Sequence, residues 1–204
     1  MCGIFASFDK EKLKKLYELN RYRGELNYSL SSFSSDSNGI KLSHLVRGEG
    51  KMPEGTIDKF LTAVDDYMVG HIQAPTSESS SIHPAEYKGR LLWHNGIIKQ
   101  STIQGYSWDT MWMLELLATR GIEMLSKFDG TFACVMYTSN GLFIFRNEIS
   151  PMFIDDELSL SSTKFERSQP LEPNTFFELN FSSRELLPLY RFTTKENPYY
   201  FGIE

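Results

Sequence analysis

The sequence predicts an α+β fold, in which helices and strand runs are segregated along the chain. Three observations predict it. Short apolar runs typical of strands recur along the 204 residues, and five of them follow one another after residue 130. The helical patterns all lie before that point. No linker rich in Pro, Gly or charge divides the chain and no internal repeat is visible, so we expect one domain over residues 1–204.

The composition excludes several classes of protein. The apolar share of 41% and the charged share of 23% are those of an ordinary globular protein. A net charge of −5 gives no electrostatic footprint for nucleic acid. The longest apolar stretch, 131–145, is interrupted by polar residues, so no membrane span is expected. Two cysteines cannot form a disulfide framework, which favours a reducing compartment and a cytoplasmic protein.

The first elements follow directly from Cys2. The apolar run 2–8 predicts a buried strand. Asp9 is suited to cap a helix whose apolar residues recur at helical spacing as far as Asn20. Gly24 lies where such a helix ends.

The next segments combine a hairpin with a helix and a loop. Strand patterns at 27–33 and 40–46 flank a turn rich in Ser, Asp, Asn and Gly, which predicts a hairpin. Apolar residues between Pro53 and Val69 recur at helical spacing and predict an amphipathic helix. Segment 73–83 is rich in Ser, Thr and Pro and is predicted as a loop, and 90–93 is predicted as a strand.

The second half begins with the strongest helical pattern of the chain. Asp109 is a plausible N-cap for a helix over 110–120, Gly121 ends it, and 122–128 is predicted as a second short helix. The remaining predicted strands are separated by turn residues and lie at 131–137, 142–145, 157–160, 175–181 and 185–190. The expected core residues are Leu114, Phe132, Cys134, Met136, Leu142 and Ile144.

Cys2 is the residue most informative about chemistry. A cysteine is small enough to permit removal of Met1, which would leave Cys2 with a free α-amino group. That amine has an ordinary pKa of about 7.7–8.0 and the thiol one of about 8.5, so a base lies beside a nucleophile in one residue. The other interpretation is that Cys2 simply begins a buried strand.

Two further features fit acyl transfer. In His94-Asn95-Gly96, an Asn amide and a following backbone N–H are suited to hold a tetrahedral oxyanion, although Asn-Gly is also a common turn. The Asp109 carboxylate either binds a substrate ammonium group or merely caps its helix. The four histidines lack metal-ligand spacing, so no metal is expected.

The order of these signals is more specific than any one of them. An N-terminal CGIF is followed by YRG, GH, HNGII, DT at a helix start and FDGTFACVMY. This series closely resembles the glutaminase domain of class II glutamine amidotransferases, such as asparagine synthetase and glucosamine-6-phosphate synthase, and extends from Cys2 to about Tyr190. The resemblance implies an N-terminal nucleophile hydrolase fold, a four-layer αββα sandwich of two antiparallel sheets. It implies no cofactor.

The resemblance also implies roles for single residues. Cys2 matches the nucleophile that attacks the side-chain amide of glutamine, with its own amine as general base. Asn95 and Gly96 match the oxyanion hole, and Asp109 matches the carboxylate that binds the α-amino group. Arg23, in YRG, matches an arginine packed near the nucleophile.

The polar loop matches the family less closely. His71 lies in the family's GHTR pattern, and Thr76 falls where the family's loop touches the substrate. Gln73 stands where GHTR has an arginine that pairs with the α-carboxylate, and an uncharged amide cannot make that ion pair. Either Arg47 or Arg90 reaches the carboxylate, or the substrate differs, or the site has lost its activity.

Three functions therefore compete. The first is a glutamine-hydrolysing amidotransferase subunit that releases glutamate and ammonia. The second is an amidohydrolase on another γ-glutamyl or amide substrate, and the third is a non-catalytic binding module on the same fold. Because the resemblance covers no synthetase or transferase domain, we expect the ammonia acceptor to lie on a separate partner chain.

Overall fold

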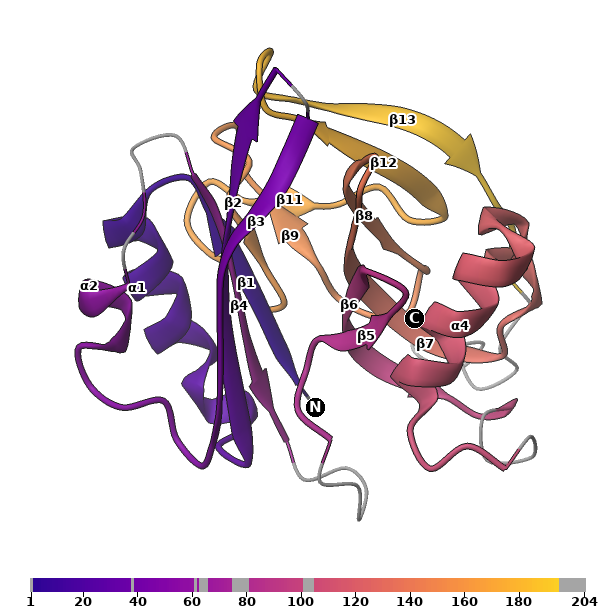
Figure 1. The fold of residues 1–204 in the computed structure, drawn as a ribbon, viewed down its shortest axis with the longest axis horizontal. Coiled ribbons are helices and arrows are strands. Elements are labelled where there is room, and N and C mark those ends of the chain that lie inside the picture. Colours follow the sequence, from indigo (N-terminus) through magenta and orange to yellow (C-terminus); the bar gives the residue numbers. More distant parts are fainter. Residues whose placement is uncertain are drawn as a thin grey trace.

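The computed structural model describes residues 2–37, 39–60, 62, 66–74, 81–100 and 105–194, which form four layers (Figure 1). Two antiparallel sheets pack face to face. Helix α1 (Lys10–Asn20) covers the outer face of one sheet, and helix α4 (Asp109–Arg120) covers the outer face of the other. The predicted α+β class and the αββα sandwich are both confirmed. Among the described helices, none is long and apolar enough to cross a membrane.

The sheet beneath α1 contains the start of the chain. Its seven strands, in spatial order, are β11 (Gln169–Pro170), β9 (Phe153–Ile154), β10 (Leu160–Ser161), β1 (Gly3–Ser7), β4 (Tyr67–Gln73), β2 (Asn27–Asp36) and β3 (Gly39–Glu49). Strand β1 pairs with β4 in the register Gly3 to Ile72, so the chain start lies beside the end of β4.

The sheet beneath α4 contains the Asn95-Gly96 pair. Its six strands, in spatial order, are β13 (Glu185–Arg191), β12 (Thr175–Asn180), β8 (Gly141–Arg146), β7 (Gly130–Thr138), β6 (Arg90–Ile98) and β5 (Ala85–Tyr87). Three short helices complete the described secondary structure, namely η1 (Arg21–Arg23), α2 (Thr56–Lys59) and η2 (Ile122–Lys127).

The alternation of side chains across each strand divides the apolar residues among three cores. Ile4 of β1 faces Trp93 and Ile144 of the opposite sheet in the core between the sheets, whereas Phe5 faces Leu16 of α1. All six expected core residues are buried. Leu142 and Ile144 pack between the sheets, and Phe132, Cys134 and Met136 pack beneath α4 in the core to which Leu114 of that helix belongs.

Four predictions from short segments of the sequence are confirmed. Asp9 caps α1, since its Oδ1 accepts a hydrogen bond from the Lys12 N–H at 2.8 Å. The predicted hairpin is the β2–β3 pair, with Ile40 opposite Ser35. The predicted strand at 2–8 is β1, and the predicted helix at 122–128 is the 3₁₀ helix η2.

The helix predicted between Pro53 and Val69 is wrong. Among the described residues of this segment only Thr56–Lys59 is helical, and Phe60 already has an extended backbone with ψ of 112°. The end of the predicted segment begins β4, which is buried along its whole length between β1 and β2. Sheet pairing on both edges of this strand outweighs the helical spacing of its apolar residues. Leu61 and Val64 lie outside the described residues.

Two predicted strands have different bounds. The strand predicted at 90–93 continues to Ile98, because β6 pairs with β7 along its whole length. The strand predicted at 157–160 is wrong except for Leu160. There Asp155 Oδ1 accepts hydrogen bonds from two backbone N–H groups, and Leu158 has a φ of +62°, so this segment is a turn.

Candidate active site

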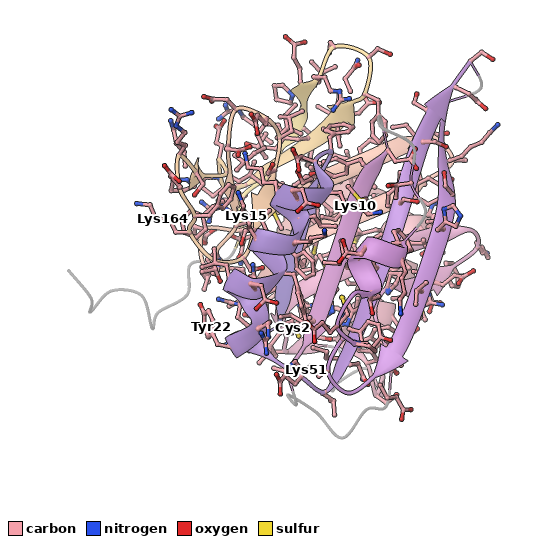
Figure 2. The ribbon with its side chains drawn as sticks, turned by 90° about the vertical axis from the view of Figure 1, so that its left-hand side faces the viewer. Cys2, Lys10, Lys15, Tyr22, Lys51 and Lys164 are labelled. Atoms are coloured by element: carbon pink, nitrogen blue, oxygen red, sulfur yellow. The ribbon has the colours of Figure 1, made fainter. Side chains whose placement is uncertain are left out.

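Cys2 lies directly before β1, at one end of the sandwich. Figure 2 shows it beside the end of α1 that leads to Tyr22, with Lys10 toward the other end of the helix. The Cys2 residue is buried, with 7% of its surface exposed. The Arg23 Nε donates a hydrogen bond to the Cys2 carbonyl oxygen at 2.8 Å. Arg23 is therefore close to the nucleophile candidate, and it holds the backbone of Cys2 rather than its thiol.

The loop after η1 explains how Arg23 reaches this position. A Cβ on Gly24 would lie only 2.4 Å from the backbone nitrogen of Ala74, so a side chain at this position would collide with the end of β4. Next to this contact, the Leu26 N–H donates a hydrogen bond to the Gln73 oxygen at 2.9 Å. Gly24 therefore lets the Arg23 loop pack against the end of β4.

Cys2 opens onto a small cavity between the two sheets and the start of α4. The cavity has a volume of about 180 Å³. Its lining residues are Cys2, Gln73, His83, His94, Gly96, Ile97, Ile98, Lys99, Tyr106, Ser107, Trp108, Asp109 and Thr110. A larger hollow of about 720 Å³ lies near Ser7 and Phe8, at the end of β1 away from Cys2.

Asn95 and Gly96 lie inside β6 and not in a turn after it. They pair with Ala133 and Phe132 of β7. Gly96 has a φ of +155°, and a Cβ there would lie 1.9 Å from the Thr131 oxygen. Only glycine fits this backbone position. The Asn-Gly pair therefore continues the pairing of β6 with β7, and Gly96 borders the cavity.

Asp109 does not cap α4, so that prediction is wrong. Trp108 is the N-cap residue, and Asp109 is the first residue of the helix. The Asp109 Oδ2 accepts a hydrogen bond from the Ile98 N–H at 2.9 Å and lies 4.0 Å from His94 Nδ1. The carboxylate thus faces the end of β6 and the cavity, where it is available to a ligand.

Buried imidazoles form the wall behind Gln73. His71 and His83 stack with ring centroids 4.0 Å apart, and the Nε2 of His71 donates to the His94 oxygen at 3.3 Å. Thr110 Oγ1 lies 3.1 Å from His83 Nε2 and also 3.1 Å from His94 Nδ1. Gln73 Oε1 lies 3.4 Å from His83 Nδ1. The Gln73 amide therefore belongs to a polar network within the protein.

The electrostatics of this wall follow from its burial. Burial lowers the pKa of His71 to about 3 and lowers the pKa of His83 well below its ordinary value. Neither imidazole carries a charge at neutral pH. Burial also raises the pKa of the Cys2 thiol, as does the Asp109 carboxylate, while the Ala74 N–H and Arg23 lower it. A buried thiol of this kind needs a neighbouring base to become a thiolate.

The buried histidines predict acid sensitivity. Between pH 7 and 5 the unfolded chain protonates His71 and His83 while the folded chain does not, so folding stability falls as pH falls below about 6.5. We expect each histidine to contribute a loss of about 2 kcal/mol over this interval. Urea unfolding of the wild type and of His71→Asn at both pH values measures it. Equal pH dependence in the two proteins would contradict the prediction.

The predicted site residues are thus partly brought together. Cys2, Gln73, Gly96 and Asp109 line one cavity, and Arg23 touches Cys2 from behind. Asn95 and His71 are buried next to the cavity and do not line it. Thr76 lies outside the described residues.

The candidate arginines Arg47 and Arg90 are elsewhere. The Nη2 of Arg47 donates to the Pro84 oxygen at 3.0 Å. Arg90 pairs with Tyr87 at the opposite end of β6 from Gly96. Neither arginine lines the cavity.

Several lining residues have no strong sequence signal. His83, Thr110 and Lys99 come from three separate segments, and only the fold brings them together. The sequence does give a weaker signal for two of them, since Thr110 is the second residue of the DT motif and Lys99 directly follows the HNGII segment. Among the described residues, no group of three or more His, Cys, Asp or Glu side chains is arranged to hold a metal ion.

The likeness of this chain to known proteins lies in its structure. No family model matches the sequence, and no curated protein matches it. Solved structures do match. The glutamine phosphoribosylpyrophosphate amidotransferase from B. subtilis superposes with a TM-score of 0.66 at 17% identity, covering 94% of this chain and 49% of that one. A structure described as the allosteric regulatory enzyme of purine biosynthesis gives 0.62 at 15% identity, covering 95% and 49%.

At these identities the likeness concerns the fold. The chain spans about half the length of these two structures. It aligns with them over nearly all of its own length and has the two antiparallel sheets with Cys2 directly before the first strand. This chain therefore has the N-terminal nucleophile hydrolase fold that is found in glutamine phosphoribosylpyrophosphate amidotransferase.

Proposed function

We propose that this protein is a glutaminase of the class II amidotransferase type, which hydrolyses the side-chain amide of glutamine through a Cys2 thioester. One observation carries the proposal most strongly. The buried Cys2 thiol, Gly96 of β6 and the Asp109 carboxylate at the start of α4 line one small cavity although they lie far apart in the sequence, and Asn95 is buried next to it. A purely structural role for these residues would not require them to lie around the same cavity.

The reaction begins when the Cys2 amine accepts the thiol proton. The sulfur then forms a bond to the amide carbon, and the carbonyl electron pair becomes an oxyanion that the Asn95 amide and the Gly96 N–H stabilise. The carbon–nitrogen bond breaks as the ammonium proton returns to the departing nitrogen, which leaves as ammonia. Water then attacks the thioester carbon while the Cys2 amine accepts one of its protons. The sulfur–carbon bond breaks, the ammonium group returns the proton to the sulfur, and glutamate is released.

The proposal requires removal of Met1. While Met1 is attached, the Cys2 nitrogen is an amide and has no basic lone pair to accept the thiol proton. After removal, the amine has an ordinary pKa of about 7.7–8.0 and is partly unprotonated near neutral pH. The released ammonia would be used by an acceptor enzyme, and we propose that this acceptor is a separate chain in the same compartment.

The charges of the cavity fit an amino acid as substrate. Asp109 contributes a carboxylate, Lys99 contributes an ammonium group, and the buried imidazole of His83 is neutral. We propose that Asp109 binds the α-amino group and that Lys99 binds the α-carboxylate, in place of the arginine that Gln73 replaces. Gln73 carries no charge and its amide already contacts His83, so it is not suited to bind an α-carboxylate. An amide substrate without an α-carboxylate is therefore the second candidate.

A substrate comparison with a Lys99 variant tests the proposal. Steady-state glutamate release is measured for glutamine, and amide hydrolysis for a glutamine derivative whose α-carboxylate is blocked. We expect glutamine to be preferred, and Lys99→Met to raise its KM about ten-fold with kcat retained, since one charge-assisted contact at an exposed side chain is lost.

The control is Lys164→Met, which removes an exposed lysine that does not line the cavity and that Figure 2 shows well away from Cys2. It is expected to leave both kinetic constants unchanged. Better turnover of the blocked derivative would select the second candidate. The protein without Met1 is assayed alone and with co-purifying proteins. If it hydrolyses neither compound, the result would support a non-catalytic module.

A further inference from the structure

Ser162 joins the two halves of the site. It directly follows β10 and is buried, with 1% of its surface exposed. Its N–H donates to the Ile4 oxygen at 2.9 Å, and its Oγ accepts from the Ile4 N–H at 3.0 Å. Both bonds are made to β1, two residues after Cys2. Ser162 is therefore fixed relative to the strand that carries the nucleophile.

The same hydroxyl also contacts the opposite sheet. The Asn95 Nδ2 donates to Ser162 Oγ at 3.4 Å. On its other side, Asn95 is held by its backbone, since the Ser150 Oγ donates to the Asn95 oxygen at 3.1 Å. A primary amide nitrogen has two protons, so one donated to Ser162 leaves the second free for a ligand. The contact thereby sets the plane of the Asn95 amide.

We propose that Ser162 is a positioning residue, which aligns the Asn95 amide with the Cys2 nucleophile. The inference rests on the proposed glutaminase function. Cys2 and Asn95 belong to different sheets, and the apolar packing between those sheets is not directional. A hydrogen bond is directional, and catalysis needs donors held close to the position where the oxyanion forms. Ser162 supplies that directional link.

The chain offers a matched control at the neighbouring position. Ser161 is also buried, but its Oγ accepts from the Asn20 Nδ2 at 2.8 Å and from the Thr163 N–H at 3.0 Å. These contacts lie toward α1 and not toward Asn95. Ser161→Ala and Ser162→Ala therefore remove the same group from equally buried sites on opposite faces of one segment.

Kinetics separate a positioning role from a structural one. Ser162→Ala is expected to lower kcat for glutamine about 10- to 100-fold with little change in KM, because oxyanion stabilisation is weakened. Alkylation of Cys2 by iodoacetamide forms no oxyanion, and its rate is expected to stay within about two-fold. Ser161→Ala should keep kcat within about three-fold of the wild type. An unchanged kcat in Ser162→Ala, or a parallel fall in alkylation, would overturn the proposal.

A spectroscopic measurement keeps the test independent of turnover. The side-chain amide signal of Asn95 is assigned in NMR spectra by its loss in Asn95→Asp. Ser162→Ala should shift this signal and accelerate its hydrogen exchange about ten-fold, and Ser161→Ala should do neither. If the wild type hydrolyses no amide, the proposed function fails, while this signal still decides whether Ser162 holds Asn95. Ser162→Cys, with a similar shape and a weaker acceptor, replaces alanine if that variant does not fold.

Discussion

Replacing Cys2 with alanine is expected to abolish glutamine hydrolysis, with a loss in kcat of about 10⁴-fold or more. In the proposed reaction the Cys2 sulfur forms the thioester, and no other thiol lines the cavity in the part of the chain that the structure describes. Cys134, the second cysteine, is fully buried beneath α4, and burial raises the pKa of its thiol well above the ordinary value. Glutamate release under saturating glutamine measures the effect.

Two controls belong to this experiment. Cys134→Ala removes the other thiol and is expected to keep the activity of whatever fraction folds. Mass spectrometry of each preparation reports whether Met1 is removed, because an unprocessed chain would lack the amine for a different reason. Activity in processed Cys2→Ala protein comparable to that of the wild type would exclude Cys2 as the nucleophile.

Replacing Asn95 with alanine is expected to lower kcat about 10²- to 10³-fold while KM changes little. The Asn95 amide is buried and contacts Ser162, so it has few ways to bind the ground-state substrate. Its proposed contribution appears only when the carbonyl oxygen becomes negative. Single-turnover kinetics that monitor ammonia release measure the step directly.

The isosteric variant Asn95→Asp sharpens this result. It keeps the shape of the side chain, removes both amide protons and introduces a carboxylate that repels the oxyanion. We expect it to be at least as impaired as Asn95→Ala. A variant that instead raises KM and keeps kcat would show that Asn95 binds the substrate and does not stabilise its transition state.

The elements predicted correctly share a local cause. Asp9 caps α1 through a contact three residues away, and the β2–β3 hairpin forms around one polar turn. Such interactions are complete within a short segment, so a single sequence displays them. The helix predicted over 53–69 is wrong because the end of this segment forms a strand that pairs on both edges with strands distant in sequence. Periodicity contains no information about that pairing.

The site divides in the same way. The sequence by itself determined the nucleophile candidate, the Asn-Gly pair, Asp109 and the likeness to one family, because these are fixed by residue type and order. Only the tertiary structure decided that Asp109 accepts from Ile98 instead of capping its helix, and that Lys99 lines the cavity while Arg47 and Arg90 do not. The physical reason is that hydrogen-bond partners and cavity walls come from separate sheets. Their approach depends on how the two sheets pack, which no local pattern encodes.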